Sequence, residues 1–281
     1  MRAYWLLTLP PAALLLAFPA AGQEQQLTVK LTDQEMERFL RTARIVRTRE
    51  LGKGVTNSLR ATLTDGTLTH DAHIQTIDQS LTRFEGTRGV ELNFRDSYKF
   101  NIAAYKLDRL LGLNMTPVSV ERRVAGKSAA VTWWVPDVMF DEQERRKRKA
   151  EPPSDEYNRQ RWIMLVFDQL IFNTDRNLGN QLVTKDWKLV MIDHTRAFRI
   201  REDLENPKAL ARCDRVFLER LKKLDQRTLE KELLPYLRSV EIRAMLKRRD
   251  RIVEHIEKAI RELGEEKVLF DYLPAGDASP R

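Results

Sequence analysis

Three polar side chains between residues 172 and 198 could act together in one chemical step. Asp175 and Asn180 lie in a polar loop that contains a glycine, and Asp193 follows a short apolar run. A hairpin predicted over residues 181–193 would bring the two carboxylates and the amide close together. A carboxylate can accept the proton of a hydroxyl group, and an amide with a second carboxylate can hold a magnesium ion. These are the groups that phosphoryl transfer requires.

The order of these residues resembles that of the atypical kinase superfamily. The spacing from Asp175 to Asn180 equals that of the kinase catalytic loop, and the residues from Asp193 to Thr195 stand in the place of Asp-Phe-Gly. The pattern Asp-Arg-x-x-x-Asn followed by Ile-Asp-His is similar to HipA-like bacterial kinases, phosphoinositide kinases and the Golgi casein kinase. A plainer interpretation stays open, because Asp and Asn are common in loops and an Asp after a strand can simply cap a turn.

The resemblance implies an α+β, two-lobed, protein-kinase-like fold. A small N-lobe, residues 23–136, would consist of an antiparallel sheet and one helix, and a mainly helical C-lobe would cover residues 137–272. The resemblance also implies that Asp175 is the catalytic base and that Asn180 and Asp193 are metal ligands. The cofactors would be ATP and Mg²⁺ or Mn²⁺.

The sequence of the N-lobe region is consistent with this implication. A helix is predicted over residues 34–42, capped by Thr32 or Asp33, and a second helix follows Asp96 and Ser97. Strands are predicted over residues 43–50, 59–64, 68–77, 118–124 and 129–135. The turn Gly52-Lys53-Gly54 lies between the first two strands, where a kinase loop covers the nucleotide phosphates. Many hairpin turns carry two glycines, so the turn alone is weak evidence.

The C-lobe region has the amphipathic periodicity of packed helices. They are predicted over residues 157–172, 209–223, 226–237 and 240–263. Residues 141–156 are rich in charge and lack apolar periodicity, so we expect a solvated loop or a frayed helix there. Residues 273–281 are predicted to form a disordered tail.

Two positions depart from the pattern of active kinases. Those enzymes hold the α- and β-phosphates with a lysine on the third strand, which pairs with a glutamate on the next helix. By analogy the lysine position falls on Gln75 and the glutamate position on Asn101, so both charges are absent. Lys53 in the glycine turn or Arg60 on the second strand could supply the missing cation. An exposed lysine in a turn need have no such role.

Composition limits the class of protein. The chain of 281 residues is 42% hydrophobic and 32% charged with a net charge of +8, which is typical of a soluble globular protein and favours acidic partners. The charge is spread along the sequence, so no specific nucleic-acid-binding face is predicted. The single cysteine, Cys213, excludes an intramolecular disulfide bond.

Residues 1–22 are predicted to be a secretory signal peptide. Arg2 precedes an apolar stretch that Pro10 and Pro11 interrupt, and small residues precede Gln23 at the expected cleavage site. A membrane-spanning helix needs about 20 apolar residues in succession, so we expect no stable membrane span. The mature protein would be periplasmic or secreted.

Three functions stay open. The first is an exported phosphotransferase that uses ATP and a metal ion to modify a protein, a lipid or another hydroxyl substrate. Gly52, Lys53, Gly54 and Gln75 would then bind the nucleotide. The second is a pseudokinase that binds a nucleotide or a partner without turnover. The third is a basic protein that binds an anionic polymer through residues 145–149.

Overall fold

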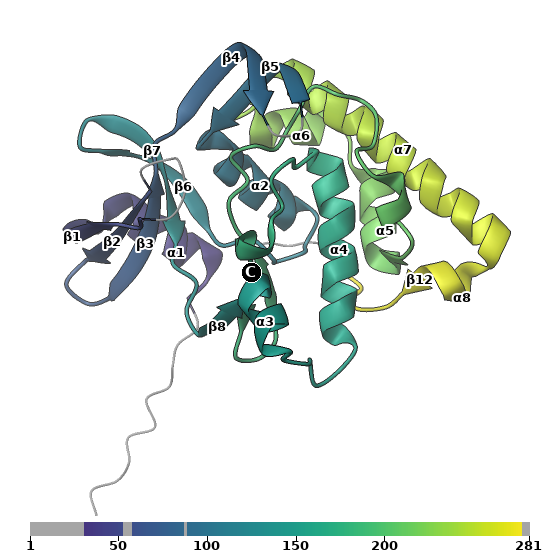
Figure 1. Ribbon diagram of the computed structural model, residues 1–281. Helices are drawn as coiled ribbons and strands as arrows, with labels where there is room; N and C mark the ends of the chain where they lie inside the picture. The colour runs from purple at the N-terminus through teal and green to yellow at the C-terminus, as the bar shows by residue number, and fades with distance from the viewer. Residues whose placement is uncertain (1–30, 53–57, 87–88, 277–281) are drawn as a thin grey trace, which may run out of the picture. The chain divides into compact units, whose positions relative to one another are not determined.

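A five-stranded antiparallel sheet forms the first lobe of the computed structural model, which describes residues 31–52, 58–86 and 89–276 (Figure 1). The strands lie in the order β1 (Arg44–Glu50), β2 (Leu59–Thr64), β3 (Thr69–Gln75), β7 (Lys127–Trp133) and β6 (Ser119–Val124). All five were predicted from the sequence. The predicted signal peptide, residues 1–22, lies outside the described residues.

One face of this sheet is apolar because alternate residues of a strand point to the same side. The buried side chains of β2 and β3 on this face are Ala61, Leu63, Ala72 and Ile74. They belong to the same hydrophobic cluster as residues of α1 (Asp33–Thr42) and α2 (Lys99–Leu110). The opposite face carries polar residues, among them Asp71 and His73, and His73 lines the candidate site.

The second lobe is mainly helical. Its long helices are α4 (Glu156–Ile171), α5 (Arg215–Lys223), α6 (Gln226–Leu233) and α7 (Ser239–Leu263), with the short helix α8 (Glu265–Val268) after them. A small sheet has the strand order β10 (Leu189–Met191), β9 (Gln181–Thr184) and β8 (Val138–Asp141), and a parallel pair joins β11 (Cys213–Asp214) to β12 (Leu269–Phe270). Two 3₁₀ turns, η1 (Leu178–Asn180) and η2 (Pro207–Ala209), complete it. The predicted α+β, two-lobed fold class is therefore confirmed.

A hairpin that the sequence analysis did not predict connects β3 to α2. Its strands, β4 (Asp78–Gly86) and β5 (Gly89–Ser97), pair only with each other among the described strands. Three of its side chains form ion pairs with the second lobe: Glu91 with Arg199, Arg95 with Glu241, and Asp96 with Arg196. The hairpin therefore links the two lobes.

Residues 142–148 form helix α3, although we expected a solvated loop or a frayed helix. Asp141 caps the helix, and the carboxylate of Glu142 is fully buried. That carboxylate pairs with Arg145 and Arg146, while Glu144 pairs with Lys147 and Arg148. Most of the basic block is thus neutralised by its own helix, which weakens the case for binding an anionic polymer.

The C-terminal segment is ordered further than predicted. Leu273, which we assigned to a disordered tail, is only 8% exposed. The buried carboxylate of Asp214 accepts hydrogen bonds from the backbone N–H groups of Tyr272 and Leu273 and also caps α5 through Phe217. The prediction began the tail too early because a buried capping carboxylate leaves no apolar pattern.

Candidate active site

A cavity of about 390 Å³ lies where the polar face of the sheet meets the second lobe. The segment that leaves β7, Trp133 to Val135, forms an apolar part of its wall. Asn101, Asn180, Asp193 and His194 form a polar part. The other lining residues are Leu51, Ser58, His73, Thr116, Pro117, Ser119, Thr132, Val138, Leu182, Met191 and Ile192. An apolar wall with a few convergent polar groups is typical of a small-molecule site.

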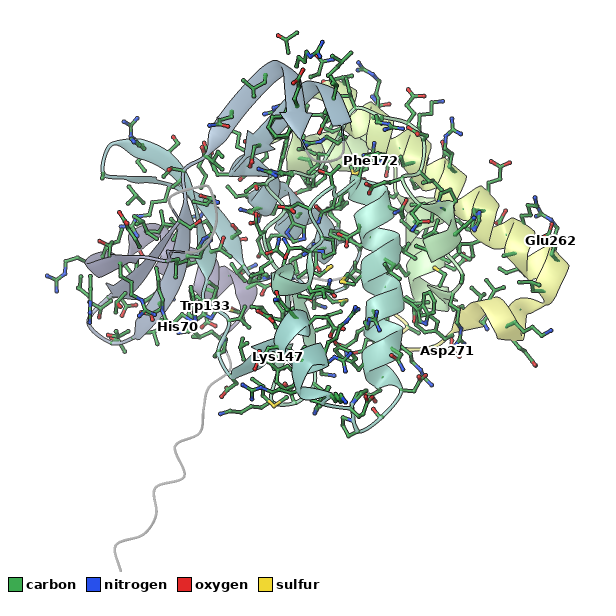
Figure 2. The ribbon with its side chains drawn as sticks, viewed as in Figure 1. His70, Trp133, Lys147, Phe172, Glu262 and Asp271 are labelled. Carbon is green, nitrogen blue, oxygen red and sulfur yellow. The ribbon has the colours of Figure 1, made fainter. Side chains whose placement is uncertain are left out.

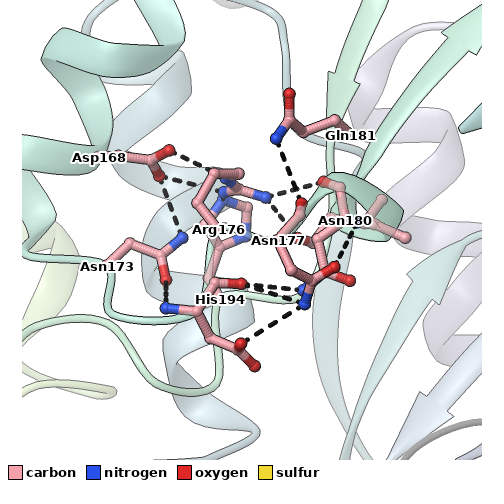
Figure 3. Close-up of polar contacts among 9 residues, drawn as sticks. Asp168, Asn173, Arg176, Asn177, Asn180, Gln181 and His194 are labelled. Carbon is pink, nitrogen blue, oxygen red and sulfur yellow. Dashed lines mark hydrogen bonds and ion pairs between the residues drawn. The ribbon is translucent and has the colours of Figure 1, made fainter. Parts of the chain in front are cut away.

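Arg176 holds the loop that carries the candidate catalytic residues (Figure 3). Its Nε and Nη2 atoms donate to the carboxylate of Asp168 at 2.9 and 3.2 Å. Its Nη1 atom donates to the backbone carbonyls of Asn180 and Ile192, each at 2.8 Å, and Nη2 also lies 2.8 Å from Nε2 of His194. One buried guanidinium group therefore fixes the loop against the strand end before Asp193.

His194 is neutral in this arrangement. Because an arginine can only donate, Nε2 of His194 must accept the hydrogen bond from Arg176, which places the ring proton on Nδ1. Burial and the neighbouring charge of Arg176 hold the pKa of His194 well below its ordinary value. The imidazole thus supports the loop without adding a second positive charge.

Asp175 and Asn180 are brought together, as the sequence predicts. Nδ2 of Asn180 donates to the backbone carbonyl of Asp175 at 3.1 Å, so the side-chain amide has a fixed orientation. Asn177 caps the turn between them, because its Oδ1 accepts from the N–H groups of Gly179 and Asn180. Its Nδ2 lies 3.4 Å from a carboxylate oxygen of Asp175. The residue at position 177 therefore positions both functional groups.

Asp193 follows β10 with a left-handed backbone, φ 52°, an uncommon conformation for a residue other than glycine. Its Oδ1 accepts hydrogen bonds from the hydroxyl group of Thr195 at 3.0 Å and from the backbone N–H of Thr195. Ile192 N donates to the carbonyl of Asn180 at 3.1 Å, which keeps Asn180 and Asp193 side by side at the cavity wall. The strained turn thus directs a carboxylate to the same wall as an amide.

The donor set at this wall fits Mg²⁺ or Mn²⁺. Both ions prefer oxygen ligands, and Mg²⁺ is commonly held by one or two protein groups together with substrate phosphates. Asn180 and Asp193 can supply one amide oxygen and one carboxylate. Among the described residues there is no cluster of three or more His, Cys, Asp or Glu side chains that could hold a metal ion by itself.

Of the two positions that lack the expected charges, Asn101 lines the cavity and Gln75 does not. Oδ1 of Asn101 accepts from the backbone N–H of His194 at 2.7 Å. Gln75 is only 1% exposed, whereas His73 on the same face of β3 lines the cavity. Burial lowers the pKa of His73, and the negative charge of Asp193 opposes that effect, so these two groups are electrostatic neighbours.

The described residues on either side of the glycine turn line the same cavity. Leu51 N donates to the carbonyl of Ser58 at 3.1 Å, and both residues line the cavity. Gly52 has a φ of +59°, which suits a turn glycine. Lys53 and Gly54 lie outside the described residues, so their role stays a prediction.

Arg60, the other predicted source of a cation, is bound elsewhere. Its Nε and Nη2 atoms contact the carboxylate of Asp71 at 2.6 and 2.5 Å, and its guanidinium group lies 4.1 Å from the ring centroid of Trp134. Arg60 does not line the cavity. The structure therefore does not bring it to the polar wall.

Sequence reasoning missed Asp168, His73 and Arg196. A signal existed for Asp168, because a carboxylate within the apolar stretch of the predicted helix over residues 157–172 requires a partner. Arg196 lies three residues after Asp193 and could have been considered for that reason. No pattern pointed to His73, because its position depends on which face of β3 meets the second lobe.

The two lobes together form a protein-kinase-like fold. No protein-family model and no curated protein sequence matches the chain. Among solved structures it is similar to hydra Fam20, solved with a sugar, with a TM-score of 0.67 and 17% identity over 85% of this chain and 92% of that one. The Golgi casein kinase with bound Mn and ADP gives a TM-score of 0.60 and 14% identity over 87% of this chain and 80% of that one. The Helicobacter pylori proinflammatory kinase CtkA gives a TM-score of 0.51 and 12% identity over 80% of this chain and 98% of that one.

Proposed function

We propose that the protein is a phosphotransferase that uses ATP and Mg²⁺ or Mn²⁺ to phosphorylate a hydroxyl group, on a protein or on another substrate. One observation carries this proposal. Asn180 and Asp193 share one cavity wall, and Asp175 is fixed beside Asn180. The bound Mn and ADP of the Golgi casein kinase, a structure with the same fold, support the choice of cofactors.

Each residue has a distinct task in this reaction. Asn180 and Asp193 would hold the metal ion, which neutralises charge on the phosphates when bound. Asp175 accepts the proton of the substrate hydroxyl group. The hydroxyl oxygen bonds to the γ-phosphorus of ATP, and the bond from that phosphorus to the bridging oxygen breaks, so that ADP leaves. The wall from Trp133 to Val135 suits the base of the nucleotide, because a flat apolar ring packs well against such residues.

Replacing Asp175 tests the proposal. Asp175→Asn keeps the shape of the side chain but removes the proton acceptor, so kcat for phosphate transfer from ATP should fall about 100-fold or more. The affinity for ATP, measured by calorimetry, should change little, because Asp175 does not line the cavity. Asp137→Asn is the matched control, since that carboxylate is 64% exposed and pairs with Lys185. Equal activity of both variants would contradict the role of Asp175.

A second candidate function is a pseudokinase that binds nucleotide without turnover. The observation that favours it is the replacement of the two charged kinase residues by the amides Gln75 and Asn101. Binding of ATP with no phosphate released or transferred, under any combination of Mg²⁺ and Mn²⁺, would support this alternative. Measurable transfer that disappears in Asp193→Asn would exclude it.

Export remains part of the proposal. Residues 1–22 have the pattern of a signal peptide, and one structural neighbour is by name a Golgi kinase. Within the described part of the chain, no helix is long and apolar enough to cross a membrane. N-terminal sequencing of the protein from its natural host should begin at or near Gln23, and recovery of an intact Met1 would overturn this expectation.

A further inference from the structure

Arg196 follows Asp193 by three positions, and the charges of both candidate functional carboxylates, Asp175 and Asp193, act on it. Its backbone carbonyl accepts hydrogen bonds from the hydroxyl group of Thr174 at 3.0 Å and from the backbone N–H of Thr174, the residue before Asp175. The preceding residue, Thr195, donates its hydroxyl group to the carboxylate of Asp193. The backbone at Arg196 is therefore fixed to both arms of the site.

The side chain of Arg196 has a buried anchor and unused donors. Its Nε atom donates to Oδ2 of Asp96 at 2.8 Å, and Asp96 is only 2% exposed. The arginine side chain itself is 31% exposed. Its Nη1 and Nη2 groups make no hydrogen bond to the described residues. One edge of the guanidinium group is thus held by Asp96, its carbon lies 5.7 Å from the ring centroid of Phe94, and its two terminal nitrogens keep their donors unused among the described residues.

Charge keeps this group cationic beside the site. Burial lowers the pKa of Arg196, but the carboxylates of Asp96, Asp175 and Asp193 outweigh that effect and raise it. Other arginines nearby are committed to structure. Arg176 is bonded to Asp168 and to two backbone carbonyls, and Arg199 pairs with Glu91.

We propose that the guanidinium group of Arg196, held in place by Asp96, contacts the transferred phosphoryl group and stabilises its charge in the transition state. This inference rests on the phosphotransferase function proposed above. Arg196 would supply from the second lobe the positive charge that Gln75 and Asn101 cannot supply. It neither accepts nor gives a proton, and its planar donors match the oxygens of a phosphoryl group.

Substitution of Arg196 in the full chain tests the inference. Arg196→Gln should lower kcat for phosphate transfer about 100- to 1,000-fold, as loss of one transition-state donor typically does. The dissociation constant of Mg-ATP should change by less than about threefold, because the contact forms mainly in the transition state. Arg196→Lys should retain part of the activity, since it keeps the charge but loses the fork. Arg201→Gln is the control, because that exposed arginine pairs with Asp203.

Chemical rescue separates catalysis from a structural role. Millimolar guanidinium chloride should restore part of the activity of Arg196→Ala and leave Asp175→Asn inactive. Asp96→Asn should also lower kcat. Guanidinium should restore the activity of this variant less than that of Arg196→Ala, because Asp96→Asn still contains Arg196.

Two outcomes would overturn the inference. One is a kcat of Arg196→Gln within about threefold of the wild-type value. The other is a loss of activity that follows the midpoint of thermal unfolding and shows no rescue. If the wild-type protein, measured first, transfers no phosphate, the proposed function fails and the inference falls with it. Active wild-type protein with a fully active Arg196→Gln would reject the inference alone.

Discussion

At the scale of single residues, Arg176 explains why the candidate site keeps its shape. The buried guanidinium group joins Asp168 to two backbone carbonyls and to His194. Arg176→Lys keeps the charge but cannot reproduce this fork, and it leaves Asp168 partly unpaired in a buried position. We expect the free energy of unfolding in urea to fall by about 3 kcal/mol. Arg201→Lys, at an exposed ion pair, should change it by less than about 0.5 kcal/mol. Similar losses in both variants would contradict this role.

His70 gives a prediction for pH at the same scale. Its ring stacks on that of Trp133, with 3.8 Å between the ring centroids (Figure 2 labels both residues). Its Nε2 atom lies 2.9 Å from the carbonyl oxygen of Trp134. Burial lowers the pKa of His70, and the hydrogen bond to Trp134 opposes that effect only in part. The folded state favours the neutral ring of His70. The stability that the neutral ring contributes is therefore complete above the ordinary pKa of about 6.5 and is lost as pH falls through the lower pKa of the folded state.

The chemical shifts of the His70 ring in an NMR titration should therefore give a midpoint below about 6.5. His70→Phe keeps the stacking but cannot titrate, so its thermal midpoint should fall less than that of the wild type between pH 7.5 and pH 5.5, where the reference value lies. A midpoint above the ordinary value would contradict the assignment.

Whether a residue of the candidate site could be predicted depends on the pattern that surrounds it in the sequence. Asp175, Asn180 and Asp193 lie within 19 positions, with fixed spacing in a loop and after a strand, so local patterns indicated them. Arg196 is held in place by Asp96, which is 100 positions away in the sequence. Contacts of that range depend on the packing of two lobes, which no local pattern encodes.

At the scale of elements, a buried apolar face made some parts easier to predict than others. Strands β2 and β3 of the large sheet alternate apolar and polar residues, because one face packs against helices. The β4–β5 hairpin was missed because most of β4 is exposed, which leaves no alternation in its sequence. Helix α3 was missed because its buried anchor is the carboxylate of Glu142 and no apolar stripe exists.

Helix α3 should depend on that carboxylate. Burial alone would raise the pKa of Glu142, but hydrogen bonds from Arg145, Tyr157 and Arg146 lower it to about 2. The stability that it contributes is thus present above the ordinary pKa and is lost as pH falls from about 4.5 toward about 2. Glu142→Gln should reduce the free energy of unfolding by about 2 kcal/mol at pH 7. Glu144→Gln, at a more exposed carboxylate on the same helix, should cost less than about 0.5 kcal/mol, and equal costs would contradict the anchor role.

At the scale of the whole folded unit, α2 and the hairpin before it make the two lobes depend on each other. Tyr105 of α2 belongs to the core under the large sheet, whereas Phe100 and Leu107 belong to the core of the helical lobe. The hairpin adds ion pairs from Arg95 to Glu241 and from Glu91 to Arg199. Because the two lobes share α2, the polar residues that they contribute to the cavity wall can keep fixed positions relative to one another.

We therefore expect the wild-type protein to unfold in urea in a single transition, with coincident curves from tryptophan fluorescence and far-ultraviolet circular dichroism. Trp133 and Trp134 lie in or next to the sheet lobe and Trp162 and Trp187 lie in the helical lobe, so fluorescence reports on both lobes, whereas circular dichroism is dominated by the helices of the second lobe. The double variant Glu91→Gln and Glu241→Gln removes two of the links, and Glu241 is only 1% exposed. The two curves should then separate, with fluorescence changing at the lower urea concentration.

The matched control for the double variant is Glu85→Gln with Glu262→Gln. These substitutions alter the same hairpin and α7, but both carboxylates are more than half exposed and pair only within their own elements (Figure 2 labels Glu262). The control should keep coincident curves, because exposed ion pairs contribute about 1 kcal/mol or less. Separate transitions in the wild type, or equal separation in both double variants, would show that the hairpin does not couple the lobes.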